Sequence, residues 1–265
     1  MNKRILYEFD GELTFREFTP GTVAKGIIVD VETNGLDPAV HKIIEFTGVK
    51  FEYCVDTGLP IRLYSKSYFN EAPISEEITE LTGITEEMVK GQVLPIGTLN
   101  ALFSDVQMVI AHNAEFDREF VNRVCTMSSK KRWLCSMRDI DWQKYRYSCR
   151  SLEYLSWAHG FYFEGHRAEI DCKALLRIIT STPPGEDITY VKKLHDLSEL
   201  SLYMVYAPNT PFESKDLLKD AKFRWNPNGK FWYKEKVYST DLPEIKELMS
   251  RVYPNEVHAK YEEML

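Results

Sequence analysis

The order of apolar and polar residues along the chain predicts three strands first and an alternation of strands and helices afterwards. Residues 25–32 and 43–51 are apolar runs with the length of buried strands, and a third strand is expected over 61–69. These segments follow one another closely, so we expect an antiparallel meander. Before them, an alternating stretch from Tyr7 to Phe18 is broken by the turn signal Asp10-Gly11, which predicts a small N-terminal hairpin.

The following hundred or so residues show helical spacing interrupted by short apolar runs. Two helix starts are expected at Ser75 and Thr85, because each hydroxyl is followed by two acids in the first turn. Further helices are predicted over 96–104, 113–125, 151–159 and 167–180, and strands over 107–111 and 132–136. Alternation of this kind predicts an α/β fold, with a mixed sheet flanked by helices.

A polar segment rich in turn formers, Thr180–Gly185, predicts the end of the first domain. We therefore expect a first domain over residues 1–182, a linker over 183–200 and a small α+β domain over 201–265. Within the last of these the pattern predicts a strand over 202–206, helices over 213–221 and 241–252, and a hairpin around 226–229.

Composition and charge narrow the class of protein only slightly. The 265 residues are 44% hydrophobic, which suits a folded core, and the formal net charge is −7. Five cysteines without a C-x-x-C pair predict reduced thiols, and no apolar run is long enough for a membrane span or a signal peptide. We expect a cytoplasmic protein, and the acidic balance leaves a nucleic-acid substrate open because a carboxylate metal site itself adds acid.

Two acids one residue apart, Asp30 and Glu32, follow the apolar run that begins at Gly26. Strand side chains alternate between faces, so these two carboxylates point the same way. Burying two like charges is very unfavourable unless something compensates them, and a divalent cation does so. Ligands that are all oxygen favour magnesium, manganese or calcium over zinc. The pair therefore predicts a metal site and phosphate chemistry.

Two predicted helices carry an acid on their apolar face. Apolar residues follow Asp117 and Asp171 at three, four and seven positions, so both acids are expected to face the core. A single helix acid of this kind is more often solvated or paired with an arginine, but two of them beside the strand pair favour one site. His166 cannot share the helix face of Asp171, which lies five residues later. It is either an ordinary surface histidine or a general base, since imidazole accepts a proton near neutral pH.

Taken in order, these residues resemble the DEDDh superfamily of 3′–5′ exonucleases over roughly residues 24–180. The matching motifs are Asp30-Val31-Glu32-Thr33-Asn34-Gly35-Leu36-Asp37-Pro38, Ala111-His112-Asn113-Ala114-Glu115-Phe116-Asp117 and His166-Arg167-Ala168-Glu169-Ile170-Asp171. The spacing H-x-x-x-x-D in the last one separates this branch from relatives that use tyrosine. The resemblance implies a ribonuclease H-like fold, in which the first strands of the mixed sheet are antiparallel.

The resemblance also implies roles for individual residues. Four acids would hold two divalent ions, Mg²⁺ or Mn²⁺, and a histidine would be the general base: Asp30, Glu32, Asp117 and Asp171, with His166. The residues implied at the terminal nucleotide are Thr33, Asn34, Gly35, Leu36, Asn113 and Phe116. Two of these have plain alternatives, because Leu36 could be an ordinary loop residue and Asn113 a helix cap.

In the C-terminal domain, basic and aromatic residues are interleaved, a composition that suits single-stranded nucleic acid. The candidate contacts are Lys215, Lys222, Arg224, Trp225, Lys230 and Trp232. Alternatively, the two tryptophans are cross-strand partners in the core of a small hairpin domain. The stretch from Phe223 to Tyr233 also resembles the C-terminal domain of exonuclease X-like nucleases, which favours DNA over RNA.

The expected function is a metal-dependent 3′–5′ exonuclease that degrades DNA, as single strands or 3′ overhangs, to nucleoside 5′-monophosphates. One alternative is a 3′–5′ exoribonuclease of the RNase T or oligoribonuclease kind. Another is an inert nucleic-acid-binding module, which the presence of all four acids disfavours. The expected partner is nucleic acid and not a membrane, and the resemblance leaves a homodimer open.

Overall fold

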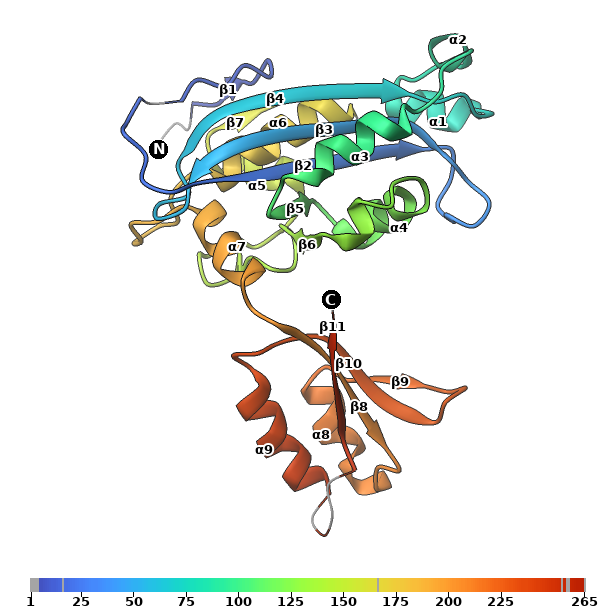
Figure 1. The fold of residues 1–265 in the computed structure, drawn as a ribbon, viewed down its shortest axis with the longest axis vertical. Helices are drawn as coiled ribbons and strands as arrows, with labels where there is room; N and C mark the ends of the chain where they lie inside the picture. The colour runs from blue at the N-terminus through green and yellow to red at the C-terminus, as the bar shows by residue number, and fades with distance from the viewer. Residues whose placement is uncertain (1–4, 16, 166, 254, 256–257, 265) are drawn as a thin grey trace. The chain divides into compact units, whose positions relative to one another are not determined.

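The computed structural model describes residues 5–15, 17–165, 167–253, 255 and 258–264. The chain divides into two compact units, residues 1–198 and residues 199–265, which we call the first unit and the C-terminal unit (Figure 1). None of the helices in the described ranges combines the length and the hydropathy that crossing a bilayer requires.

The first unit is built on a five-stranded mixed sheet with strand order β4-β3-β2-β5-β6 (Figure 1). The strands are β2 (Val23–Thr33), β3 (Ile43–Cys54), β4 (Pro60–Phe69), β5 (Met108–Ala111) and β6 (Arg132–Cys135). As predicted, β2, β3 and β4 form an antiparallel meander. The strand β5 then pairs parallel to β2, and β6 pairs parallel to β5, which confirms the mixed sheet.

Helices cover both faces of this sheet and give it two cores. The helices of this unit are α1 (Glu76–Thr82), α2 (Glu86–Val89), α3 (Ile96–Ser104), α4 (Ala114–Val124), α5 (Leu152–Ala158), α6 (Ala168–Ile179) and α7 (Tyr190–Ser198), with a 3₁₀ turn at Ser128–Lys130. Alternate residues of β2 enter different cores, because Ile28 packs with α5, α6 and α7 whereas Ile27 and Val29 pack with α3 and α4. Asp30 and Glu32 therefore share the sheet face that α6 covers.

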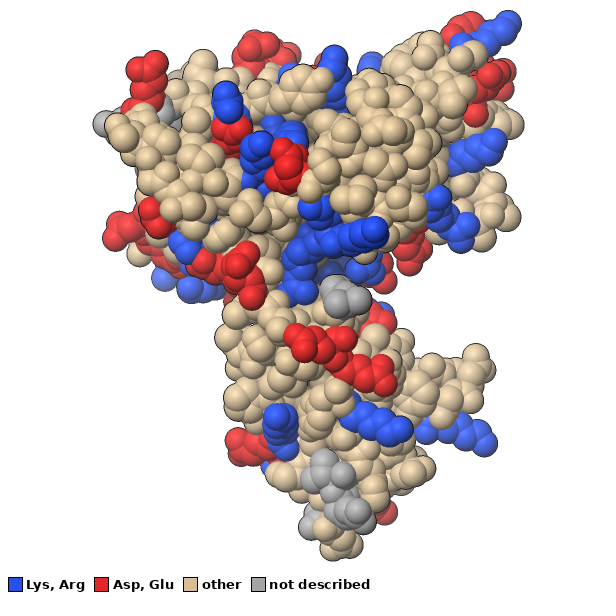
Figure 2. Space-filling model, in the orientation of Figure 1, with Lys and Arg blue, Asp and Glu red and all other residues tan. Residues whose placement is uncertain are grey.

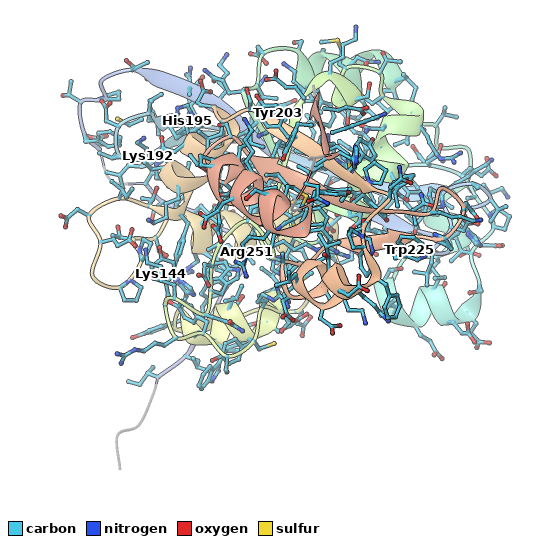
Figure 3. All side chains as sticks on the ribbon, turned by 90° about the horizontal axis from the view of Figure 1, so that it is seen from below. Lys144, Lys192, His195, Tyr203, Trp225 and Arg251 are labelled. Atoms are coloured by element: carbon cyan, nitrogen blue, oxygen red, sulfur yellow. The ribbon has the colours of Figure 1, made fainter. Side chains whose placement is uncertain are left out.

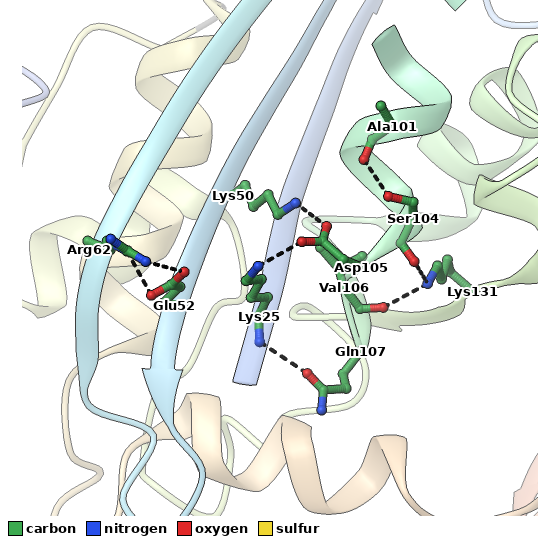
Figure 4. Close-up of polar contacts among 10 residues, drawn as sticks. All are labelled: Lys25, Lys50, Glu52, Arg62, Ala101, Ser104, Asp105, Val106, Gln107 and Lys131. Carbon is green, nitrogen blue, oxygen red and sulfur yellow. Dashed lines mark hydrogen bonds and ion pairs between the residues drawn. The ribbon is translucent and has the colours of Figure 1, made fainter. Parts of the chain in front are cut away.

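An ion-pair cluster fixes the end of α3 against the first residues of β2 (Figure 4). Lys25 Nζ donates to Asp105 Oδ2 at 2.7 Å, Lys50 Nζ also contacts Asp105, and the Lys25 backbone N–H donates to Gln107 Oε1 at 3.1 Å. Although burial acts to raise it, hydrogen bonds from the two lysines lower the pKa of Asp105 to about 2. The cluster thus joins the end of α3 to the start of β2, directly before the residues of β2 that pair with β5.

The N-terminal segment differs from the predicted hairpin. The short strand β1 (Tyr7–Glu8) pairs parallel with β7 (Phe161–Tyr162), about 150 residues later in the chain. Phe9 is buried against Phe161, with ring centroids 5.5 Å apart, and the Arg177 guanidinium lies over both rings. Burial of Phe9 on the first unit thus replaces the local pairing that the turn signal Asp10-Gly11 suggested.

The segment expected to be a linker over 183–200 contains α7, which belongs to the first unit. Tyr190, Val191 and Leu194 are fully buried in the core that contains α6. His195 is buried too, and its Nδ1 lies 2.9 Å from the Tyr53 hydroxyl of β3. The division between the units therefore falls after Ser198 and not at Pro183-Pro184, because α7 completes the core of the first unit.

The C-terminal unit is a four-stranded antiparallel sheet with strand order β11-β8-β10-β9, covered on one face by two helices. Its elements are β8 (Leu202–Pro208), a 3₁₀ turn at Phe212–Ser214, α8 (Lys215–Asp220), β9 (Arg224–Asn226), β10 (Phe231–Tyr238), α9 (Leu242–Val252) and β11 (Lys260–Met264). Its core joins Val205 and Val237 of the sheet to Leu218 of α8 and Met249 of α9. The last strand, β11, was not predicted from the sequence.

Removal of the α7 side chains should destabilise the first unit. We expect Leu194→Ala to lower its free energy of unfolding by about 2–5 kcal/mol, because the substitution leaves a cavity in the core. The exposed substitution Asp196→Ala on the same helix should change it by less than about 0.5 kcal/mol. Denaturant unfolding of the full chain, followed by circular dichroism, checks this. Equal effects of the two substitutions would mean that α7 is not part of this core.

Candidate active site

The strand β2 extends beyond its parallel partner, and the candidate site lies at this extension. Only Gly26–Ile28 of β2 pair with β5, so the residues that follow have no strand partner on that side. The Val31 backbone N–H instead donates to Asp117 Oδ1 of α4 at 3.2 Å. A buried N–H needs a hydrogen-bond acceptor, and here a carboxylate supplies it. The end of a short strand thus brings the acid of α4 to the acids of β2.

Three carboxylates meet on the α6 side of the sheet. Asp30, Glu32 and Asp171 each offer an oxygen atom, and these atoms all lie within 4.8 Å of one another. Asp171 is in the first turn of α6, where the Arg167 backbone N–H donates to its Oδ2 at 3.0 Å. The positive end of a helix stabilises negative charge at this position.

Asp117 is the fourth acid, and it lies next to Asp30. It is only 3% exposed, and its charge is the second cause, after burial, that raises the pKa of Asp30. It is not a member of the three-carboxylate group. Asp30 therefore interacts both with Glu32 and Asp171 and with Asp117. The structure brings together the four acids that the sequence singled out.

The electrostatics of this cluster are unfavourable without a cation. Burial, followed by the charge of Asp171, raises the pKa of Glu32 to about 7, although Arg167 opposes the shift. Burial also raises the pKa of Asp117 to about 8, against the hydrogen bond from Val31. The atoms that could coordinate a metal ion here are all carboxylate oxygens. Such a set of ligand atoms fits a hard divalent ion such as Mg²⁺ or Mn²⁺.

A fifth acid, Glu45 of β3, was not identified from the sequence. It lies directly opposite Glu32 in the strand register and is 2% exposed. Arg167 Nε lies 3.7 Å from its Oε2, an atom that has no hydrogen-bond partner among the described residues. Burial raises the pKa of Glu45, and Arg167 and the backbone of Ala168 act against this. An acid within the apolar run Ile43-Ile44-Glu45-Phe46 was the signal that could have revealed it.

The predicted base, His166, lies outside the described residues. Its chain neighbours are placed beside Asp171. The Arg167 backbone N–H donates to this acid, and a Cβ atom added to Gly165 would lie 3.5 Å from Asp171 Oδ1.

The loop after β2 is held by its own side chains. Thr33 Oγ1 donates to Gly35 O at 2.7 Å, and Asn34 donates to Pro73 O at 2.9 Å while accepting from Lys42 N at 2.7 Å. A Cβ atom at Gly35 would meet the His41 ring at 2.2 Å, so a larger residue there would have to displace this ring. Leu36 follows directly and is 83% exposed. The loop thus presents an apolar side chain to solvent from a hydrogen-bonded base.

Asn113 and Phe116 lie at the start of α4. Asn113 has a left-handed backbone, with φ of 77°, and its side chain does not cap the helix. Asn113 is thus the N-cap residue of α4, as expected, but its side-chain Oδ1 accepts from Arg138 Nη2 at 3.4 Å and not from the helix backbone. Phe116 is half-buried against Phe120, with ring centroids 5.0 Å apart.

The candidate contacts of the C-terminal unit do not share one surface. Trp225 lies opposite Trp232 in the register, with ring centroids 5.5 Å apart, and Trp232 packs on the helix-covered core. Trp225 is 46% exposed and lies on the hairpin, away from Tyr203 (Figure 3). Arg224, its neighbour in β9, points to the opposite face of the sheet. The remaining candidates lie in turns or at a helix start: Lys215, Lys222 and Lys230.

Comparison with known proteins identifies the first unit. A family model described as RNase T exonuclease matches residues 27–179, which include all four acids. The chain belongs to this exonuclease family. The motif-based resemblance to the DEDD 3′–5′ exonuclease superfamily is thereby confirmed.

The relatives of this exonuclease are much longer proteins. It is 38% identical over 98 residues to the DNA polymerase III PolC-type of Halalkalibacterium halodurans, a match that covers 36% of this chain and 7% of that protein. The corresponding protein of Thermotoga petrophila is 31% identical over 125 residues, or 44% of this chain and 8% of that protein. The chain therefore matches less than a tenth of the length of these relatives.

Among solved structures, the exonuclease resembles the zinc-bound E. coli ExoI–ssDNA complex. The TM-score is 0.50 at 14% identity, and the match covers 70% of this chain and 48% of that chain. At this identity the likeness shows the fold alone, which agrees with a ribonuclease H-like mixed sheet.

The raised pKa values predict that the protein without divalent ions loses stability as the pH rises. The folded state binds the Glu32 proton more tightly than the unfolded state, so stability falls between about pH 4.5 and about pH 7, and further to about pH 8 through Asp117. Added Mg²⁺ or Mn²⁺ should raise the Tm more at pH 8 than at pH 5. Thermal unfolding in EDTA and in excess metal measures both effects.

The substitution Glu32→Gln should reduce this pH dependence and the gain from metal, because it removes one of the repelling charges. Glu80→Gln, at an exposed position of α1, is the matched control and should leave both unchanged. A gain from metal that is independent of pH and survives in Glu32→Gln would place the cation elsewhere.

Proposed function

We propose that this chain is a divalent-metal-dependent 3′–5′ exonuclease that hydrolyses DNA, as single strands or 3′ overhangs, to nucleoside 5′-monophosphates. The observation that supports this most directly is the convergence of Asp30, Glu32 and Asp171 within 4.8 Å, with Asp117 beside them, in a chain of the exonuclease family. A partly buried cluster made only of carboxylates is unfavourable for a fold without a cation.

Asp30, Glu32 and Asp171 would hold one divalent ion, and Asp30 with Asp117 would hold a second. When bound, such ions stabilise charge on phosphoryl oxygens and lower the pKa of a coordinated water. Arg167 and Glu45 keep the first turn of α6 against β3, so that Asp171 stays aimed at Asp30. The hydrogen bond from the Val31 N–H to Asp117 holds the first turn of α4 against β2 in the same way.

His166 is proposed as the group that accepts the proton of the attacking water. The motif that His166 shares with DEDDh exonucleases supports this role, and the next residue, Arg167, hydrogen-bonds Asp171 through its backbone. The exposed side chain of Leu36 would pack on the terminal base, while Asn113 and Phe116 would line the other side. Backbone amides of Thr33, Asn34 and Gly35 would contact the terminal sugar.

DNA is proposed as the substrate on the strength of the relatives, which are named as DNA polymerase III PolC-type. The alternative substrate is RNA, as in the nuclease for which the family model is named. The acids do not distinguish the two, since they contact phosphate and not the 2′-hydroxyl.

Replacement of a central acid should abolish hydrolysis while the fold is kept. We expect Asp30→Asn to lower the rate of hydrolysis at least about 100-fold. Loss of a residue that only supports a metal ligand already lowers affinity or activity about 10–100-fold, and Asp30 is proposed as a direct ligand. Glu169→Gln is the matched control, since this acid of α6 pairs with Lys173 and Ser65. Gel analysis of a labelled single strand measures the rate. Full activity of Asp30→Asn, or of the unmodified chain in excess EDTA, would contradict the metal mechanism.

Matched DNA and RNA strands with one end blocked test direction and substrate in the same assay. Blocking the 3′ end should stop degradation, and blocking the 5′ end should not. Faster degradation of RNA than of DNA would favour the exoribonuclease alternative, and binding without hydrolysis in Mn²⁺ would favour the inert module.

The exposed leucine should contribute to substrate binding and not to stability. Leu36→Ser should raise KM roughly fivefold, which corresponds to a loss of about 1 kcal/mol of apolar contact, and leave Tm unchanged. Val40→Ser is the control, because Val40 is 72% exposed in the same loop. Equal kinetics for the two variants would show that Leu36 is an ordinary loop residue.

A further inference from the structure

The C-terminal unit has a sheet face that its helices do not cover. Val205, Ala207 and Trp232 point toward α8 and α9. Because strand side chains alternate, Tyr206 and Tyr233 point to the other side of the sheet. In Figure 2, basic side chains of this unit lie near the β9–β10 hairpin with acidic side chains above them, and a mixed group lies on the side of α9.

One cross-strand row on the uncovered face spans all four strands. The register places Lys260 of β11 beside Tyr206 of β8, Tyr206 beside Tyr233 of β10, and Tyr233 beside Arg224 of β9. Two tyrosine rings are thus central, and a cation lies at each edge. Both cations are exposed, and both rings are half-buried. Neighbouring strands are about 4.8 Å apart, so the two cations are separated by roughly 14 Å at their Cα atoms.

A third ring completes the cluster. Phe231 lies two residues before Tyr233 on the same face, and its ring centroid is 5.5 Å from that of Tyr206 and 6.2 Å from that of Tyr233. Both contacts are edge-on, so the Phe231 ring does not stack on either tyrosine ring.

We propose that this aromatic face, consisting of Tyr206, Phe231, Tyr233, Arg224 and Lys260, binds single-stranded nucleic acid. Flat rings at the centre of an antiparallel sheet suit stacking with unpaired bases, and cations at both edges suit the phosphates on either side. The proposal rests on the proposed nuclease function for its substrate class. It differs from the sequence-based expectation, in which Trp225 and Trp232 stacked the bases.

Acidic groups bound the face on one side. Glu262 lies two residues after Lys260 on the same face, and after burial its hydrogen bond raises the pKa of Tyr206, with a smaller contribution from Glu235. These acids repel the phosphates of a nucleic acid. The nucleic-acid strand would therefore cross the face on the side of Phe231, which pairs with Asn226 of β9.

The test is binding of a fluorescent oligothymidylate to the full chain in EDTA, which separates binding from hydrolysis. We expect Tyr233→Leu to weaken binding about tenfold, because base–ring stacking contributes about 1–3 kcal/mol and tenfold equals 1.4 kcal/mol. Tyr233→Phe should retain the affinity, since the ring remains. Phe212→Leu removes an 80% exposed ring elsewhere in this unit and is the matched control.

The edge cations give a second measurement that does not depend on the packing of the rings. Arg224→Gln and Lys260→Gln should each reduce the slope of log Kd against log salt by about 0.7. In active protein with Mg²⁺, the same variants should raise KM and leave kcat unchanged. Absence of any hydrolysis would refute the proposed function without affecting the binding result.

Three outcomes would overturn the proposal. Binding unchanged by Tyr233→Leu and by both charge variants would show that nucleic acid does not use this face. Loss of binding in Trp225→Leu alone would show that the nucleic acid binds the other face of the sheet, to which Trp225 and Trp232 point. A dimer in sedimentation that Tyr233→Leu dissociates, with unchanged oligonucleotide affinity, would identify the occupant as a second copy of the chain.

Discussion

Mutual repulsion among partly buried carboxylates is the constraint on which the first unit depends. The acids of β2, α4 and α6 lie where the sheet would otherwise be apolar, and their pKa values are raised chiefly by burial. Backbone N–H groups hold the two helix acids in place. Asp117 accepts from Val31, and Asp171 accepts from Arg167. Protonation relieves the repulsion at low pH, and the divalent ions proposed above would neutralise the charge at higher pH.

The short strand β5 is the feature that makes this arrangement possible. If β5 ran alongside the whole of β2, the Val31 N–H would pair with another strand and leave no place for the first turn of α4. Because the pairing ends at Ile28, a helix supplies both the hydrogen-bond acceptor and the fourth acid. The site therefore depends on where the pairing of β5 with β2 ends as well as on the acidic side chains.

Apolar periodicity was enough to predict the meander, the helices around the acids and the mixed sheet, because these elements are long and regular. The positions of Asp30 and Asp117 followed from the same patterns. The features that could not be predicted from the sequence depend on contacts between segments far apart in the chain. The pairing of β1 with β7 joins segments about 150 residues apart, and Glu45 became relevant only through its register with Glu32. In the C-terminal unit, the face to which Trp232 points depended on which side α8 and α9 cover.

The burial of α7 has a consequence for how the chain folds as it is synthesised. All four acids lie between residues 30 and 171, but Tyr190, Val191 and Leu194 fill the core behind them. The first unit cannot close its hydrophobic interior until residue 194 has left the ribosome. By then the ribosome's exit tunnel already contains the start of the C-terminal unit. If translation pauses before α7 has left the ribosome, the first unit would therefore expose apolar surface. If it pauses after α7 has emerged, the first unit can bury its core.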